Sequence, residues 1–188
     1  MRTKSRMETD QVTTENKQWY VLRDLKRANA KYPAYRLLQD QSVRMFTPMR
    51  WVVSSQNGHL VREQHPCLQD LLFAYESYNS LSQLIDPIST LQFRYIKGAW
   101  RKPMTVSNEE MDRFIYAVET SNAPIYFSPD EVTIAMLGRR VRIFGGPLNG
   151  YEGNLLAIRG SKQKRLLIDL CGILYAAVEV NPDFIQLV

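Results

Sequence analysis

The sequence predicts an α+β fold, in which an antiparallel sheet flanked by helices is followed by a small β-barrel. Three observations predict it. The pair Asn57-Gly58 interrupts a run of alternating apolar and polar residues, a pattern typical of a β-hairpin. A capped, amphipathic helix is expected over Thr105–Thr120. After Leu137 the chain consists of short apolar runs separated by turn residues, which favours a barrel.

The composition is that of ordinary soluble domains. Of the 188 residues, 45% are hydrophobic and 23% are charged, so the chain can form a core. The net charge of +5 suits a nucleic-acid neighbourhood but is also common on solvated surfaces. No apolar run approaches the roughly 18 residues of a membrane span, and the polar N-terminus lacks the apolar region of a secretory signal. The two distant cysteines, Cys67 and Cys171, indicate a reducing cytoplasm.

Strand and helix signals alternate in the first part of the chain. The expected strands are Gln18–Leu25, Val43–Val53, Leu60–Arg62, Leu68–Tyr75 and Leu91–Ile96. The expected helices are one that starts between Asn29 and Pro33 and ends near Gln41, Asn79–Ile85, and Thr105–Thr120. In the last helix Ser107 and Glu110 form a capping box, and the apolar stripe that begins at Met111 must face a core.

The domain organisation follows from these elements. Residues 1–16 are expected to be a flexible tail, 17–120 the first domain, 121–136 a linker and 137–188 the barrel. Within the linker, the apolar run Ile125–Phe127 can pin the segment onto a domain. The expected barrel strands are Arg140–Phe144, Tyr151–Arg159, Arg165–Cys171, Ile173–Val180 and Phe184–Leu187.

The most specific motif lies in residues 138–153. A strand runs into Gly-Pro-Leu-Asn-Gly and then Glu-Gly before a second strand. Pro147 fixes one φ angle, whereas Gly150 and Gly153 permit backbone angles forbidden to other residues, so the chain can reverse quickly. Leu148 is expected to cover one end of the barrel. This order of residues resembles the KOW motif of NusG-type elongation factors and of several ribosomal proteins.

The first domain resembles the N-terminal (NGN) domain of the NusG family. Trp19-Tyr20-Val21 opens the first strand, and a segment beginning at Pro66 enters a buried strand, where Gln69-Asp70-Leu71 replaces the family's usual Pro-Gly-Tyr. The order of elements matches the family over residues 17–188. The segments 29–38, 46–49 and 71–73 are similar to specialised, UpxY-like paralogues that govern capsular polysaccharide operons.

This resemblance implies a transcription elongation or antitermination regulator that is not an enzyme. Its first domain would dock on the clamp helices of RNA polymerase. The polymerase contacts that it implies are Trp19, Tyr20, Leu68 and Leu71. The alternative is plain core packing, because aromatic residues and leucines on strands are usually buried.

The resemblance also implies that the barrel recruits a second protein, which is ribosomal protein S10 or Rho in the general factor. The implied barrel contacts are Phe144, Pro147, Leu148 and Tyr151. Their alternative role is to fill the barrel.

Basic residues on the barrel are candidates for phosphate contacts, which need only positive charge within reach. These candidates are Arg139, Arg140, Arg142, Lys162, Lys164 and Arg165. A solvated hairpin loop explains the cluster around Lys162 equally well. In the first domain, Trp100 lies among the basic residues Arg94, Lys97, Arg101 and Lys102, and this mixture suits single-stranded nucleic acid.

No catalytic residue, metal ligand or cofactor is expected, since neither His59 nor His65 has a nucleophile or ligand at diagnostic spacing. Gly145-Gly146 precedes a proline turn and a strand, unlike a phosphate loop. Two alternatives to the regulator stay open. A continuous basic stripe across both domains would favour an RNA- or ribosome-associated KOW protein. A deep pocket with convergent titratable groups would favour an enzyme with an accessory barrel.

Overall fold

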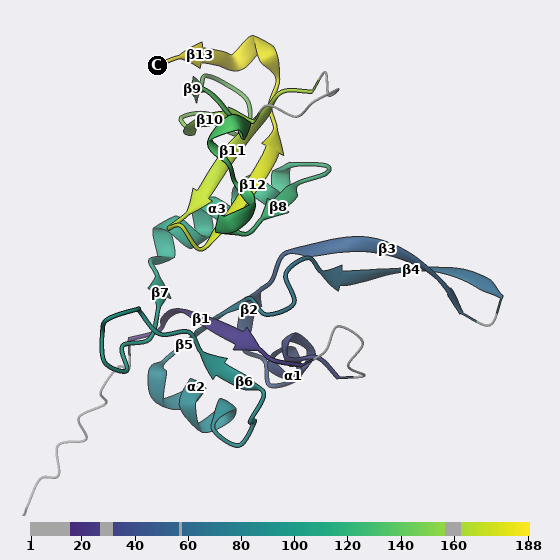
Figure 1. Cartoon of the computed structure of the whole chain (residues 1–188), viewed down its shortest axis with the longest axis vertical. Coiled ribbons are helices and arrows are strands. Elements are labelled where there is room, and N and C mark those ends of the chain that lie inside the picture. The colour runs from purple at the N-terminus through teal and green to yellow at the C-terminus, as the bar shows by residue number, and fades with distance from the viewer. Residues whose placement is uncertain (1–15, 27–31, 57, 157–162) are drawn as a thin grey trace, which may run out of the picture.

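The computed structural model describes residues 16–26, 32–56, 58–156 and 163–188 (Figure 1). The elements of the first part are β1 (Gln18–Asp24), α1 (Ala34–Asp40), β2 (Arg44–Phe46), β3 (Met49–Gln56), β4 (His59–Pro66), β5 (Leu72–Glu76), α2 (Tyr78–Ile85), β6 (Leu91–Phe93), β7 (Thr105–Val106) and α3 (Asn108–Thr120). Those of the second part are β8 (Ile125–Phe127), β9 (Leu137–Ile143), β10 (Glu152–Leu156), β11 (Arg165–Leu170), β12 (Leu174–Glu179) and β13 (Ile185–Leu187). The predicted α+β class is confirmed.

The first part is built on an antiparallel sheet with both faces covered by helices. The strand order is β2-β5-β1-β6, and β7 also pairs with β1. Successive residues of a strand point to opposite faces. Trp19 and Val21 therefore share a core with Phe114 of α3, whereas Tyr20 and Leu22 share one with α1 and α2.

Helix α3 begins where its capping residues place it. The Ser107 hydroxyl accepts a hydrogen bond from the Glu110 backbone N–H at 3.2 Å, and the Glu110 carboxylate reaches back, which completes the predicted capping box. The two residues Thr105–Val106, which were expected in the helix, instead pair with β1 as strand β7. The cap thus defines the helix start more sharply than the apolar pattern does.

Helix α1 begins at Ala34, directly after Pro33. The Ala34 backbone N–H donates to the Asp24 carboxylate at 2.9 Å. The helix N-terminus is therefore capped by a side chain from β1. The expected start lay between Asn29 and Pro33, and Asn29 itself lies outside the described residues.

The hairpin of β3 and β4 forms a sheet of its own and reaches well beyond the rest of the first part (Figure 1). Its return strand, His59–Pro66, is longer than the predicted Leu60–Arg62. The expected strand Val43–Val53 is broken after β2, because Pro48 has no N–H for a ladder and Thr47 donates its hydroxyl to the Leu71 carbonyl at 3.0 Å.

The second part is a six-stranded antiparallel sheet with the order β13-β9-β10-β11-β12-β8. All five predicted strands form, and the sixth, β8, comes from the predicted linker and pairs with β12. The next linker residues, including Val132 and Met136, pack against a small outer cluster around Leu167. The apolar run Ile125–Phe127 therefore holds the segment on the barrel.

The glycine motif makes the turn between β9 and β10. Gly145, Gly146 and Gly150 have φ angles of 99°, 64° and 82°, and the Asn149 side chain accepts from the Gly145 N–H at 2.7 Å. Gly153 was expected to need an unusual backbone angle, and it does not have one. Glycine is needed at this position because there is no room for a side chain. A Cβ atom there would lie 2.4 Å from the backbone carbonyl oxygen of Leu167 in the neighbouring β11.

Candidate functional site

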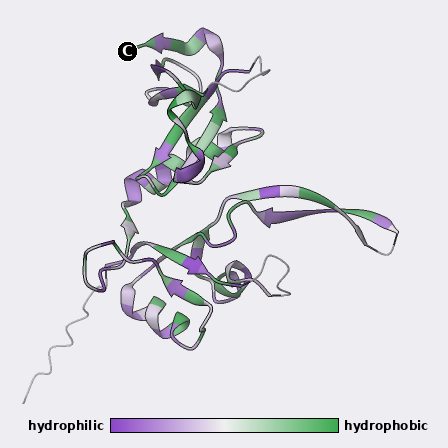
Figure 2. Ribbon diagram, viewed as in Figure 1, coloured by the Kyte–Doolittle hydropathy of each residue, from purple (hydrophilic) through white to green (hydrophobic). Residues whose placement is uncertain are grey.

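One face of the β3–β4 hairpin carries exposed apolar side chains. Val53 lies directly opposite Arg62, and Leu60 is one pair further along the same face. Trp51, Val53 and Leu60 are each more than half exposed, and the Arg62 guanidinium lies 4.4 Å from the centre of the Trp51 ring. We call these four residues the arm face. Figure 2 shows both hydrophobic and hydrophilic residues along this hairpin.

The sequence did contain a signal for the arm face, namely the alternating pattern through Val53. The sequence does not show whether another strand covers this face. Alternation predicts that one face is apolar, but only the structure shows that this hairpin pairs with no third strand among the described residues. An exposed apolar surface rimmed by polar groups is typical of a protein-binding site.

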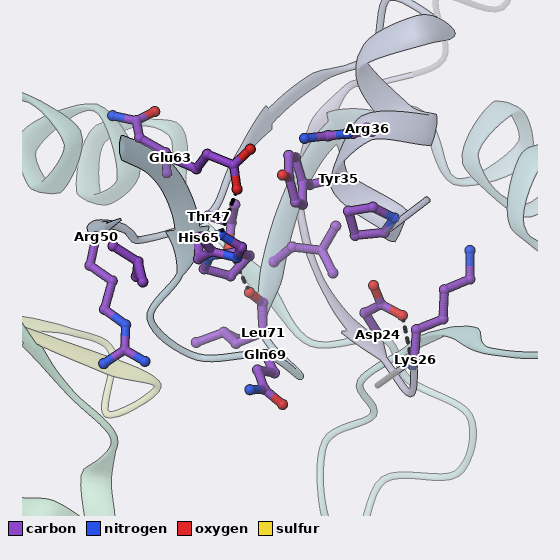
Figure 3. A pocket seen from close by; sticks show the side chains of 15 residues that line it. Asp24, Lys26, Tyr35, Arg36, Thr47, Arg50, Glu63, His65, Gln69 and Leu71 are labelled. Atoms are coloured by element: carbon purple, nitrogen blue, oxygen red, sulfur yellow. Dashed lines mark hydrogen bonds and ion pairs between the residues drawn. The ribbon is translucent and has the colours of Figure 1, made fainter. Parts of the chain in front are cut away.

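A hollow of about 330 Å³ lies at the base of the hairpin, between β4, α1 and the start of β5 (Figure 3). Some of its polar groups are bonded to nearby residues. Asp24 accepts from the backbone N–H groups of Lys26 and Ala34, each at 2.9 Å, and His65 lies 3.5 Å from the Glu63 carboxylate. Among the described residues that line the hollow, no nucleophile is hydrogen-bonded to an adjacent base.

Three of the four implied polymerase contacts are core residues. Trp19, Tyr20 and Leu71 are at most 3% exposed, and the first two point to opposite faces of the sheet. Helices cover both faces of this sheet, so these three side chains are packed inside the first part of the chain. Leu68 is half-buried and packs at the edge of the core that includes Trp19.

The implied contacts on the barrel divide in the same way. Phe144 and Pro147 are exposed at the glycine turn, whereas Leu148 and Tyr151 are buried. Leu148 covers the barrel core, as expected, and the Tyr151 hydroxyl donates to the backbone carbonyl of Arg113 at 2.8 Å. A partner that approaches the turn would therefore meet Phe144 and Pro147 first.

Three of the six candidate phosphate contacts on the barrel are paired with carboxylates. Arg140 and Arg142 both bind the Glu152 carboxylate, and Arg142 together with Arg140 holds the pKa of that carboxyl below its usual range. Arg165 is only 6% exposed, and its guanidinium donates to Glu179 at 2.8 Å and to the Ala123 carbonyl at 2.7 Å.

The remaining candidates are few. Arg139 and Lys164 are exposed, and Lys162 lies outside the described residues. Glu152 forms ion pairs with both Arg140 and Arg142, so one carboxylate partly offsets these two positive charges.

Helix α3 joins the two parts, since it packs on the sheet with one side and on the barrel with another. The Arg113 guanidinium lies 4.4 Å from the centre of the Tyr151 ring. At the turn after β11, the exposed Cys171 lies beside the Glu110 carboxylate of α3. Burial and then this carboxylate raise the pKa of Cys171 to about 11.

Two further features bear on the class of protein. Within the described ranges, no cluster of three or more His, Cys, Asp or Glu residues is arranged to hold a metal ion. Among the described helices, none is both long and apolar enough to cross a membrane.

Comparison with known proteins places the chain in a family. A family model described as "Transcription termination factor nusG" matches residues 17–115, from the start of β1 into α3. No curated protein sequence matches. Fourteen solved chains are similar, among them one described as "Domain interaction in Thermotoga maritima NusG", with 12% identity, a TM-score of 0.48, and coverage of 92% of this chain and 98% of that one. That likeness is too distant to carry an argument about the site. The family model, however, covers more than half of the 188 residues, and the chain therefore belongs to the NusG family.

Proposed function

We propose that this chain is a specialised regulator of transcription elongation or antitermination, which binds RNA polymerase and acts in the cytoplasm without catalysis. The observation that carries the proposal is the NusG family match over residues 17–115. The specialised role rests on the resemblance of segments 29–38, 46–49 and 71–73 to the UpxY-like paralogues of capsular polysaccharide operons.

The arm face supports docking of the first domain on the clamp helices of the polymerase. Tryptophan and arginine are the residues that most often dominate binding energy at protein interfaces, and here Trp51 and Arg62 are stacked and exposed together. Leu68 would extend the contact. The buried residues Trp19, Tyr20 and Leu71 would contribute indirectly, by stabilising the core of the first part of the chain.

The barrel would recruit the second partner, ribosomal protein S10 or Rho if it follows the general factor. Phe144 and Pro147 are exposed at the turn and would contact the partner. Leu148 and Tyr151 are buried and would stabilise the turn. Arg139 and Lys164 are available for a phosphate contact. The alternative of an RNA- or ribosome-associated KOW protein is weaker, because Glu152 partly offsets two of the basic residues on the barrel.

The docking proposal is tested by pull-down of the full chain with core RNA polymerase. Leu60→Asp places a charge on the arm face and should weaken binding at least tenfold, as loss of an interface anchor does. Leu187→Asp is the matched control, because Leu187 is a similarly exposed leucine on the barrel. Wild-type binding by Leu60→Asp would remove the arm face from the proposal, and no binding by the wild-type chain would refute polymerase docking.

The regulatory role needs a second assay. Transcription past a terminator on a cognate leader template should show more read-through when the chain is added. Unchanged read-through, with binding to polymerase intact, would count against antitermination alone.

A further inference from the structure

The loop between β6 and β7 combines an exposed aromatic side chain with unpaired positive charge. Trp100 is 89% exposed, and no acidic residue occurs in the sequence from Arg94 to Met104. Arg94 is bound to Asp70 at 2.9 Å. Lys97, Arg101 and Lys102 are exposed, and in the described part of the chain none of the three makes an ion pair.

The loop is held in one shape by its own backbone. The Ile96 N–H donates to the Lys102 carbonyl at 2.9 Å, and Tyr95 forms a bridge with Pro103. Arg101 has a φ of 46°, a left-handed conformation that a residue other than glycine adopts at a cost. Its guanidinium lies 5.5 Å from the centre of the Trp100 ring. The aromatic ring and the charges are therefore presented together before any ligand arrives, which lowers the entropy lost on binding.

We propose that this loop binds single-stranded nucleic acid, with a base stacked on Trp100 and the flanking phosphates contacted by Lys97, Arg101 and Lys102. A flat aromatic ring beside several cations is how proteins hold single strands without reading their sequence. A duplex keeps its bases stacked inside and has no free face for the ring. The proposal goes beyond polymerase docking, because Figure 1 shows this loop at the opposite end of the first domain from the β3–β4 hairpin.

Tryptophan with lysine and arginine also occurs where proteins rest on anionic membranes. That mode depends on a broad apolar face, usually along an amphipathic helix. The loop offers only Trp100 and the partly exposed Tyr95 and Ile96 on a tight turn. Single-stranded nucleic acid is therefore the occupant that the chemistry favours.

The test is fluorescence anisotropy of the full chain with labelled single-stranded DNA, single-stranded RNA and duplex DNA, each about 12 nucleotides long. At least one single strand should bind more than tenfold tighter than the duplex. Trp100→Ala should weaken that binding about 5- to 100-fold, whereas Trp100→Phe, which keeps a ring, should retain most of it. Lys97→Gln should reduce the slope of log affinity against log salt by about 0.7.

Trp51→Ala is the matched control, because Trp51 is also exposed and also lies under an arginine. The proposal is refuted if Trp100→Ala binds like the wild type, if Trp51→Ala loses as much, or if the duplex is preferred. It is equally refuted if the oligonucleotides do not bind while vesicles with anionic lipid bind through Trp100. Trp100→Ala should still bind core polymerase in the pull-down, so the two proposals succeed or fail separately.

Discussion

The thiol of Cys171 should report whether the barrel is seated on α3. Burial raises its pKa from 9.0 to about 11 together with the Glu110 carboxylate, which belongs to the helix and not to the barrel. Only the thiolate reacts with thiol reagents. At pH 8 a thiol with a pKa of 9 is ~10% thiolate, whereas one with a pKa of 11 is ~0.1% thiolate, so Cys171 should react roughly 100-fold more slowly than a free cysteine.

Replacing Glu110 by glutamine removes the charge while leaving a side chain that can still serve in the capping box. The pKa of Cys171 should then fall, and the reaction at pH 8 should become several-fold faster. The raised pKa of Cys171 also makes the stability of the folded chain depend on pH. Because the folded state favours the neutral thiol, the stabilising contribution is complete below pH 9 and is lost as the pH rises through 11.

The rate of reaction with a maleimide or an aromatic disulfide is measured from pH 7 to pH 10. Cys67→Ser leaves Cys171 as the single thiol, since the chain has two cysteines, and adding Cys171→Ser to that variant provides the blank. A midpoint at or below pH 9 in the folded chain, or a rate that Glu110→Gln does not change, would show that the helix and the barrel do not meet as described.

Three stability predictions are checked by urea denaturation followed by circular dichroism. Arg165→Met leaves the Glu179 carboxylate without its partner and should cost about 2–3 kcal/mol, with Arg165→Lys losing less. If Arg165→Met is neutral, the buried pair is not structural. Ser107→Ala removes the cap of α3 and should cost about 1 kcal/mol, and a cost below the error of the measurement would discount the capping box. Gly153→Ala should be the most damaging, at about 3 kcal/mol or more, because its Cβ would meet backbone and not a flexible side chain; a stable variant would show that the two strands can separate.

The elements that depend on short stretches of sequence could be predicted. The capping box at Ser107 and Glu110, the five barrel strands and the reversal at Gly150 all follow from residues within a few positions of each other. Segment boundaries were less accurate where distant pairing decides them. Thr105–Val106 has helical neighbours in sequence but pairs with β1, which lies more than 80 residues earlier.

The candidate site was harder to predict, because burial depends on what covers each face. Trp19 and Tyr20 look equally available in the sequence, and helices on both sides of the sheet bury them. In the sequence, Arg165 stands beside other basic residues and looks like one of a surface cluster. Its guanidinium is used instead by Glu179 on the neighbouring strand and by the Ala123 carbonyl, 42 residues away. The exposed Trp51 belongs to a hairpin whose lack of cover could not be foreseen.

Strand β8 determines where one barrel could be exchanged for another between related proteins. The recognisable glycine motif starts at residue 138, which suggests a junction just before it. A junction there would leave β8 with the donor of the first domain and strip the cover from Leu167, Leu156 and Ala177. The bared apolar strand would invite aggregation. A functional chimaera should therefore be joined at the end of α3, so that the segment from Ser121 travels with the barrel to which it is bonded.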